Sequence, residues 1–145
     1  MKTFNIAAAL SLLAAPAFAD GHAASGDAAA GEEQFNRQCV SCHVVADADG
    51  NVLAGRAAKT GPNLFGVAGG TPGSVDGFRY GNSIVEYGET GAVWVEENFV
   101  TWVMDPTGFV REALDDNRAR AKMSYKVRDE GDATNIYAYL ASLSE

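Results

Sequence analysis

The sequence predicts an all-α fold. Apolar residues recur at helical spacing near residues 27–40, 94–105 and 132–143, and a further short helix is expected over 107–114. Residues 44–93 contain many glycines and few periodic runs, so long loops are expected there. With 145 residues, 47% of them hydrophobic and 21% charged, the chain has the composition of one small globular domain.

The charge of the chain excludes one class of function. Its 19 acidic and 11 basic residues give a formal net charge of −8. A protein that binds nucleic acid needs a basic face to neutralise phosphates, so no nucleic-acid partner is expected. Two cysteines are too few for a disulfide-rich scaffold.

Residues 1–19 have the pattern of a secretory signal peptide. Lys2 supplies the positive start, an apolar run follows, and the small-x-small pattern predicts cleavage after Ala19. An uncleaved anchor is the alternative, but the apolar run is shorter than the roughly 20 residues that cross a bilayer. We expect export to the periplasm, a single domain over 20–145, and a mobile tail over 20–26.

The first expected helix, near residues 27–40, has a start signal and a face to bury. Ser25 or Asp27 can cap its N-terminus. Gly31 and Phe35 lie four positions apart on one face. A glycine inside a helix is costly unless a neighbour packs closely, so Gly31 indicates the closest approach of another helix.

The run CVSCH at residues 39–43 is a C-x-x-C-H motif, the pattern for covalent haem attachment. Cys39 and Cys42, on one helical turn, can each add to a vinyl group of one porphyrin, and His43 then projects its imidazole at the iron. A zinc site, a thioredoxin-like redox pair and a tight disulfide are the other interpretations. The zinc site would have only His22 or carboxylates to complete it, and the redox pair has no βαβ pattern around it.

The turn TGPNL at residues 60–64 follows the motif. Pro62 has no backbone N–H, and its carbonyl is a natural acceptor for the imidazole N–H of His43. The alternative is an ordinary turn proline.

Two methionines of the mature chain are candidates for a second axial ligand of a haem iron. Met104 ends the expected helix over 94–105 and has the spacing of a core residue. Met123 lies in the polar stretch 118–126, where no amphipathic pattern explains a thioether. A ligand role would explain Met123, and an exposed or gap-filling methionine is the alternative.

The last expected helix begins near Asp132, which is a good cap, and ends near Leu143. Its apolar stripe has i, i+3, i+4, i+7 spacing and consists of Ile136, Tyr139, Leu140 and Leu143. This stripe needs a partner, and Gly31 of the first helix permits a close approach.

Six segments between Gly31 and Leu143 occur in a specific order: GEEQFNRQCVSCH, KTGPNLFGV, GFRYGNSI, VWVEENFVTWVMDP, AKMSYKV and NIYAYLASL. In this order they resemble the class I cytochromes c, in particular the bacterial periplasmic cytochromes c2. The C-x-x-C-H motif alone indicates only a haem c, whereas the ordered set is far more specific. The resemblance implies the class I fold, with four or five helices and long loops wrapped around one covalent haem c.

The resemblance also implies roles for individual residues. Gly31 and Phe35 would cross the last helix at Ile136 and Tyr139. The implied cofactor-binding residues are the thioether attachments Cys39 and Cys42, the axial ligands His43 and Met123, the carbonyl partner Pro62, and the propionate partners Tyr80 and Trp94.

Two positions depart from the family pattern. Trp102 stands where the family usually has a tyrosine near the methionine sulfur, so an indole N–H would tune the potential differently. Gly70 stands where many members have an arginine on the propionate side, and Arg56 or Arg79 are the candidates to compensate.

The implied function is electron transfer rather than enzymatic catalysis, because a haem with His and Met ligands has no open site. The resemblance implies a monomeric carrier between a quinol:cytochrome c oxidoreductase and a terminal oxidase or photosynthetic reaction centre. The alternatives are an open-site haem protein, either peroxidase-like or a gas sensor, and a dedicated electron acceptor of one periplasmic dehydrogenase.

Five basic residues near Met123 predict a docking patch on an otherwise acidic protein. No acidic residue interrupts them in the sequence, and they are Arg118, Arg120, Lys122, Lys126 and Arg128. Such a patch suits a transient, salt-sensitive encounter with a membrane redox complex. A solvated loop is the alternative.

Overall fold

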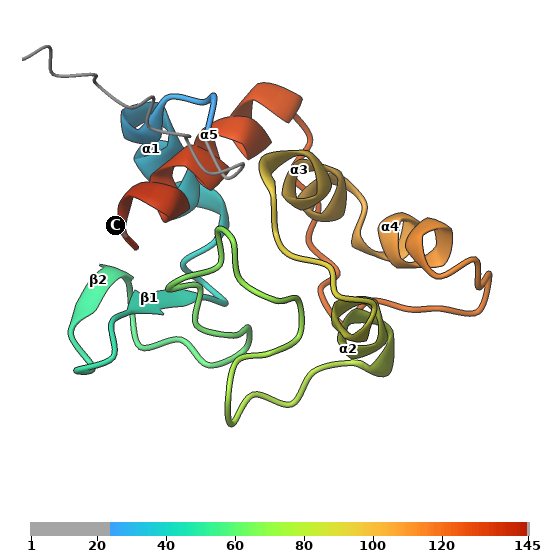
Figure 1. The fold of residues 1–145 in the computed structure, drawn as a ribbon. Helices are drawn as coiled ribbons and strands as arrows, with labels where there is room; N and C mark the ends of the chain where they lie inside the picture. The colour runs from blue at the N-terminus through green and yellow to red at the C-terminus, as the bar shows by residue number, and fades with distance from the viewer. Residues whose placement is uncertain (1–23, 145) are drawn as a thin grey trace, which may run out of the picture.

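The structure, a computed structural model, describes residues 24–144 (Figure 1). Within this range the elements are α1 (Ala28–Gln38), β1 (Val44–Ala46), β2 (Val52–Gly55), α2 (Asn82–Glu89), α3 (Glu96–Met104), α4 (Pro106–Ala113) and α5 (Glu130–Ser142). The prediction of four or five helices joined by long loops is confirmed. The predicted signal peptide, its cleavage after Ala19 and residues 20–23 lie outside the described residues.

Helices α1 and α5 cross closely, as Gly31 predicted (Figure 1). A Cβ on Gly31 would collide with the backbone carbonyl of Asn135 and approach the Cβ of Tyr139 to 2.8 Å. Beside this contact the rings of Phe35 and Tyr139 lie 5.6 Å apart, and Phe35 is fully buried. The missing side chain of Gly31 therefore sets how near the first and last helices come.

The N-terminal cap of α1 agrees with the sequence prediction, whereas the N-terminal cap of α5 does not. Asp27 caps α1 by accepting hydrogen bonds from the N–H groups of Ala29 and Ala30, at 2.8 and 3.1 Å. The prediction that Asp132 caps the last helix is wrong. Asp129 is the cap, and its carboxylate accepts from the N–H of Asp132 at 3.0 Å, so Asp132 lies inside the first turn.

Three elements lie within residues 44–93, where only loops were predicted. Strands β1 and β2 form a short antiparallel hairpin with a register shift after Val45. Helix α2 begins after Gly81, which provides no side-chain cap. Its contact with the preceding loop depends on Gly88, where a Cβ would collide with the Pro72 carbonyl. These elements bury too few apolar side chains to produce a periodic pattern; in α2 only that of Ile84 is buried.

The residues before α1 are attached to the rest of the fold, whereas the predicted tail extended to residue 26. Both the backbone N–H and the hydroxyl of Ser25 donate to the Glu96 carboxylate, at 2.6 Å each. The N–H of Asp27 donates to the side chain of Asn135 at 2.8 Å. These bonds join the start of α1 to α3 and α5. No helix in residues 24–144 is long and apolar enough to span a membrane.

Replacing Gly31 by alanine is expected to destabilise the haem-loaded protein by about 2–3 kcal/mol, because the new methyl group forces α1 away from the α5 backbone. Gly131→Ala is the matched control, since a Cβ there meets only the exposed Asp129 carboxylate and improves helix propensity. Urea unfolding measures both. Equal stability of the two variants would show that the crossing is not tight.

Candidate functional site

A cavity of about 450 Å³ lies between the helices and the long loops. It is lined by the end of α1, loop 60–75, α3, segment 122–127 and α5. All eight residues implied as haem-binding line this one cavity: Cys39, Cys42, His43, Pro62, Tyr80, Trp94, Trp102 and Met123. The fold thus collects residues that are more than 80 positions apart in the chain.

The C-x-x-C-H motif forms a tight turn that leaves α1. The N–H groups of Cys42 and His43 both donate to the Cys39 carbonyl, at 3.1 and 2.9 Å. Both cysteines are free thiols. Burial, with a smaller contribution from Cys42, raises the pKa of the Cys39 thiol to about 12, so the thiol is uncharged at neutral pH.

The imidazole of His43 has a defined tautomer. Its Nδ1 lies 2.9 Å from the Pro62 carbonyl, and because a carbonyl only accepts, Nδ1 carries the proton. Burial lowers the pKa of His43 more than this bond raises it, so the ring is neutral with Nε2 unprotonated. A neutral imidazole whose other nitrogen bonds a carbonyl is the form that binds metal.

The TGPNL turn packs directly on the motif. No residue with a side chain fits at position 61, because a Cβ on Gly61 would come within 2.6 Å of His43 Nδ1. The N–H of Gly61 donates to the Cys42 carbonyl at 2.7 Å, and that of Leu64 to the Val44 carbonyl at 2.9 Å. These bonds hold the carbonyl of Pro62 beside the His43 ring.

Asn63 completes this attachment, a role that the sequence analysis missed. Its side-chain oxygen accepts from the N–H of Ala46 at 2.9 Å, and its nitrogen donates to the Ala46 carbonyl at 2.7 Å. The amide thus replaces one step of a β-ladder along β1. An asparagine after Pro62 is a sequence signal, but its partner 17 positions away is not.

Met123 and several aromatic side chains also line the cavity. Met123, on a segment without helix or strand, and Met104, at the end of α3, are both half-buried and pack against the core, but only Met123 lines the cavity. The rings of Trp94 and Trp102 lie 5.7 Å apart. Burial raises the pKa of Tyr80, so its hydroxyl remains a donor at neutral pH.

The structure also shows what surrounds Gly70, one of the two positions that depart from the family pattern. Gly70 lines the cavity, and its carbonyl accepts from the backbone N–H of Trp94 at 2.8 Å. Arg56 and Arg79 are exposed and do not line the cavity. Neither arginine therefore occupies the place that Gly70 leaves.

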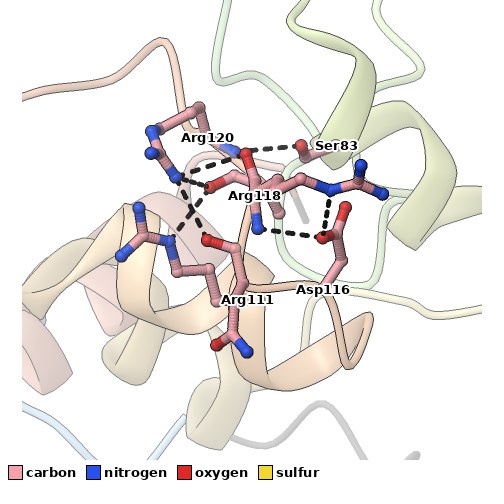
Figure 2. Close-up of polar contacts among 7 residues, drawn as sticks. Ser83, Arg111, Asp116, Arg118 and Arg120 are labelled. Atoms are coloured by element: carbon pink, nitrogen blue, oxygen red, sulfur yellow. Dashed lines mark hydrogen bonds and ion pairs between the residues drawn. The ribbon is translucent and has the colours of Figure 1, made fainter.

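Most of the predicted basic patch is exposed but engaged in bonds within the protein. Arg118 pairs with Asp116 at 3.5 Å, and Lys126 pairs with Asp105 at 2.7 Å. Lys122 donates to the Arg79 carbonyl, and Arg120 donates to carbonyls of its own loop (Figure 2). The two ion pairs reduce the net charge that the patch presents to a partner, whereas the bonds to neutral carbonyls leave the charges of Lys122 and Arg120 unchanged.

The residues around the cavity fit a covalent haem. Two free thiols, a neutral imidazole and a thioether line the same cavity, and its lining is mostly apolar. Among residues 24–144 no three His, Cys, Asp or Glu side chains gather as a metal site would require, so the zinc alternative has no support there.

Comparison with known proteins agrees with this site. No protein-family model matches the chain. Cytochrome c2 of Rhodovulum adriaticum is 59% identical over 119 residues, which are 82% of this chain and 94% of that protein. Cytochrome c2 of Cereibacter sphaeroides is 47% identical over 137 residues, 94% of each chain. This chain belongs to the cytochrome c2 family.

The crystal structure of cytochrome c2 from Rhodobacter sphaeroides superposes on this family member with a TM-score of 0.79. It is 48% identical, and the match covers 81% of this chain and 96% of that one. The predicted class I cytochrome c fold is thereby confirmed. As a cytochrome c2, the protein carries one covalent haem c, attached through Cys39 and Cys42, and transfers electrons rather than acting as an enzyme.

Proposed function

We propose that His43 and Met123 are the axial ligands of the haem iron and that the protein is a periplasmic one-electron carrier. The observation that carries the proposal is that one cavity is lined by both attachment cysteines, by His43 and by Met123, while Met104 lies outside its lining. A haem with a His and a Met ligand exchanges single electrons and has no open coordination position.

The other lining residues have supporting roles in this proposal. The Pro62 carbonyl holds the proton on His43 Nδ1, which keeps Nε2 available and makes the imidazole a stronger donor. Tyr80 and Trp94 supply an O–H and an N–H donor for the propionates. Trp102 offers an indole N–H on the Met123 side. The apolar lining excludes water and favours the less charged, reduced state.

The proposed partners are membrane redox complexes. The donor is a quinol:cytochrome c oxidoreductase, and the acceptor is a terminal oxidase or a photosynthetic reaction centre. The protein would reach them as a monomer of residues 20–145, after export and cleavage behind Ala19. Docking would use the exposed basic side chains near Met123, namely Arg118, Arg120, Lys122, Lys126 and Arg128.

Optical spectra of the purified protein, oxidised and reduced, test the ligation. The expected result is a c-type α-band, a weak far-red band from sulfur-to-ferric-iron charge transfer, and no change when carbon monoxide is added to the reduced form. A high-spin spectrum that shifts with carbon monoxide would indicate an open site and favour a peroxidase-like or gas-binding protein.

The double variant Arg118→Ala, Arg128→Ala is expected to slow association with a quinol:cytochrome c oxidoreductase about threefold at low salt and to weaken the salt dependence of the rate. Both side chains are exposed and lie outside the cavity lining. Arg56→Ala, an exposed charge beyond β2, is the control. Stopped-flow kinetics at several ionic strengths measure the effect, and equal slowing by Arg56→Ala would contradict a local patch.

A further inference from the structure

The segment that carries Met123 has little backbone structure of its own. Within residues 24–144, no main-chain N–H or carbonyl of residues 120–126 bonds to another main-chain group. Backbone bonds resume only on either side, from Ala119 to Asp116 at 3.0 Å and from Val127 to Val103 at 2.9 Å. Since a backbone without such bonds opens easily, the position of Met123 depends on how the two ends are held.

The upstream end is held by two arginines that share one acceptor. The Ala119 carbonyl accepts from Arg111 Nε at 3.2 Å and from Arg120 Nη1 at 2.9 Å (Figure 2). The same Nη1 also approaches the carbonyls of Asn117 and Arg118, at 3.3 and 3.2 Å. Bonds with a charged donor are stronger than those between neutral groups, and Ala119 is buried.

Two hydroxyl groups extend this attachment to the next residues. The N–H of Arg120 donates to the Ser83 hydroxyl at 3.2 Å, and that of Ala121 donates to the Thr107 hydroxyl at 3.3 Å (Figure 2 shows the first). Ser83 belongs to α2, whereas Thr107 and Arg111 belong to α4. The turn before Met123 is therefore fixed to two helices through side chains alone.

We propose that Arg111 and Arg120 are positioning residues for Met123. By bonding the same Ala119 carbonyl, and together with the Ser83 and Thr107 hydroxyls, they hold residues 119–121 on α2 and α4 and keep the thioether at the cavity. This inference rests on the proposed ligation by Met123. Arg120 then acts mainly inside the protein, while Arg118 and Arg128 remain for contact with a partner.

The rate at which cyanide binds to the ferric, haem-loaded protein tests the inference, because cyanide enters only after the Met123 segment opens. Arg111→Ala and Arg120→Ala are each expected to raise this rate about tenfold, as for the loss of one charge-assisted hydrogen bond. The matched controls Arg118→Ala and Arg128→Ala remove the same charge and are expected to leave the rate within about twofold. The double variant Arg111→Ala, Arg120→Ala should exceed the product of the single effects, because either arginine alone still bonds the Ala119 carbonyl and only the double variant leaves it without a side-chain donor.

Global unfolding in urea and the far-red band separate the outcomes. If cyanide binds faster while the urea midpoint of global unfolding changes little, the arginines act locally on the Met123 segment, as proposed. Rates equal to those of the controls, while the parent protein shows the far-red band, would overturn the positioning role. A parent without that band would instead overturn the ligation by Met123. If Arg111→Ala does not fold, Arg120→Ala decides alone, because Arg120 is exposed, and parental rates in it would contradict the inference.

Discussion

Replacing Met123 by alanine is expected to open the sixth coordination position of the iron. The variant should lose the far-red band and bind carbon monoxide when reduced. The neutral thioether favours ferrous iron, so its loss should also lower the reduction potential. A fall of about 120 mV or more is expected, a hundredfold change in the redox equilibrium at ~59 mV per tenfold for one electron. Potentiometric titration followed optically measures it.

Met104→Leu is the matched control for this experiment. Met104 ends α3 outside the cavity lining, and leucine has a similar volume, so both the potential and the far-red band should be retained. If Met104→Leu loses the band and Met123→Ala keeps it, the two methionines have been assigned the wrong way round. If the parent protein lacks the band, the sixth ligand is not a methionine.

The sequence predicted well those parts of the fold in which one helix buries one face. The stripe from Ile136 to Leu143 and the small residue Gly31 together predicted the crossing of α1 and α5. Helix α2 and the hairpin were missed because each buries too few apolar residues to show a period. Asp129 was missed as a cap because Asp132 offers the same side chain three positions later, and only the backbone geometry distinguishes the two.

Some residues of the candidate site could likewise be predicted from the sequence, and others could not. The cysteines and His43 form a contiguous motif, and its chemistry follows from spacing alone. The pairing of Asn63 with Ala46, 17 positions away, depends on how the loop after Pro62 meets β1. The pairing of Arg111 with Ala119, eight positions away, depends on the path of the chain after α4, so no local pattern predicts either one. Counting charges along the sequence overestimated the free charge of the basic patch, because Lys126 pairs with Asp105, which lies 21 positions earlier.

A large cavity lies at the centre of the fold, and part of the apolar core forms its wall. Without haem, this cavity of about 450 Å³ would either stand empty and lose packing contacts, or fill with water and expose its mostly apolar lining. Either outcome destabilises the fold. The haem therefore contributes a large part of the apolar core.

The double variant Cys39→Ala, Cys42→Ala, prepared without haem, is accordingly expected to lack stable tertiary structure. Helix content by far-ultraviolet circular dichroism should be reduced, and calorimetry should show no cooperative transition. Ser41→Ala with haem attached is the control, since it alters the same turn and keeps both thiols. A cooperative, native-like melt of the haem-free double variant would mean that the α1 and α5 crossing, with Phe35 and Tyr139 packed across it, is sufficient to hold the chain folded around a vacant centre.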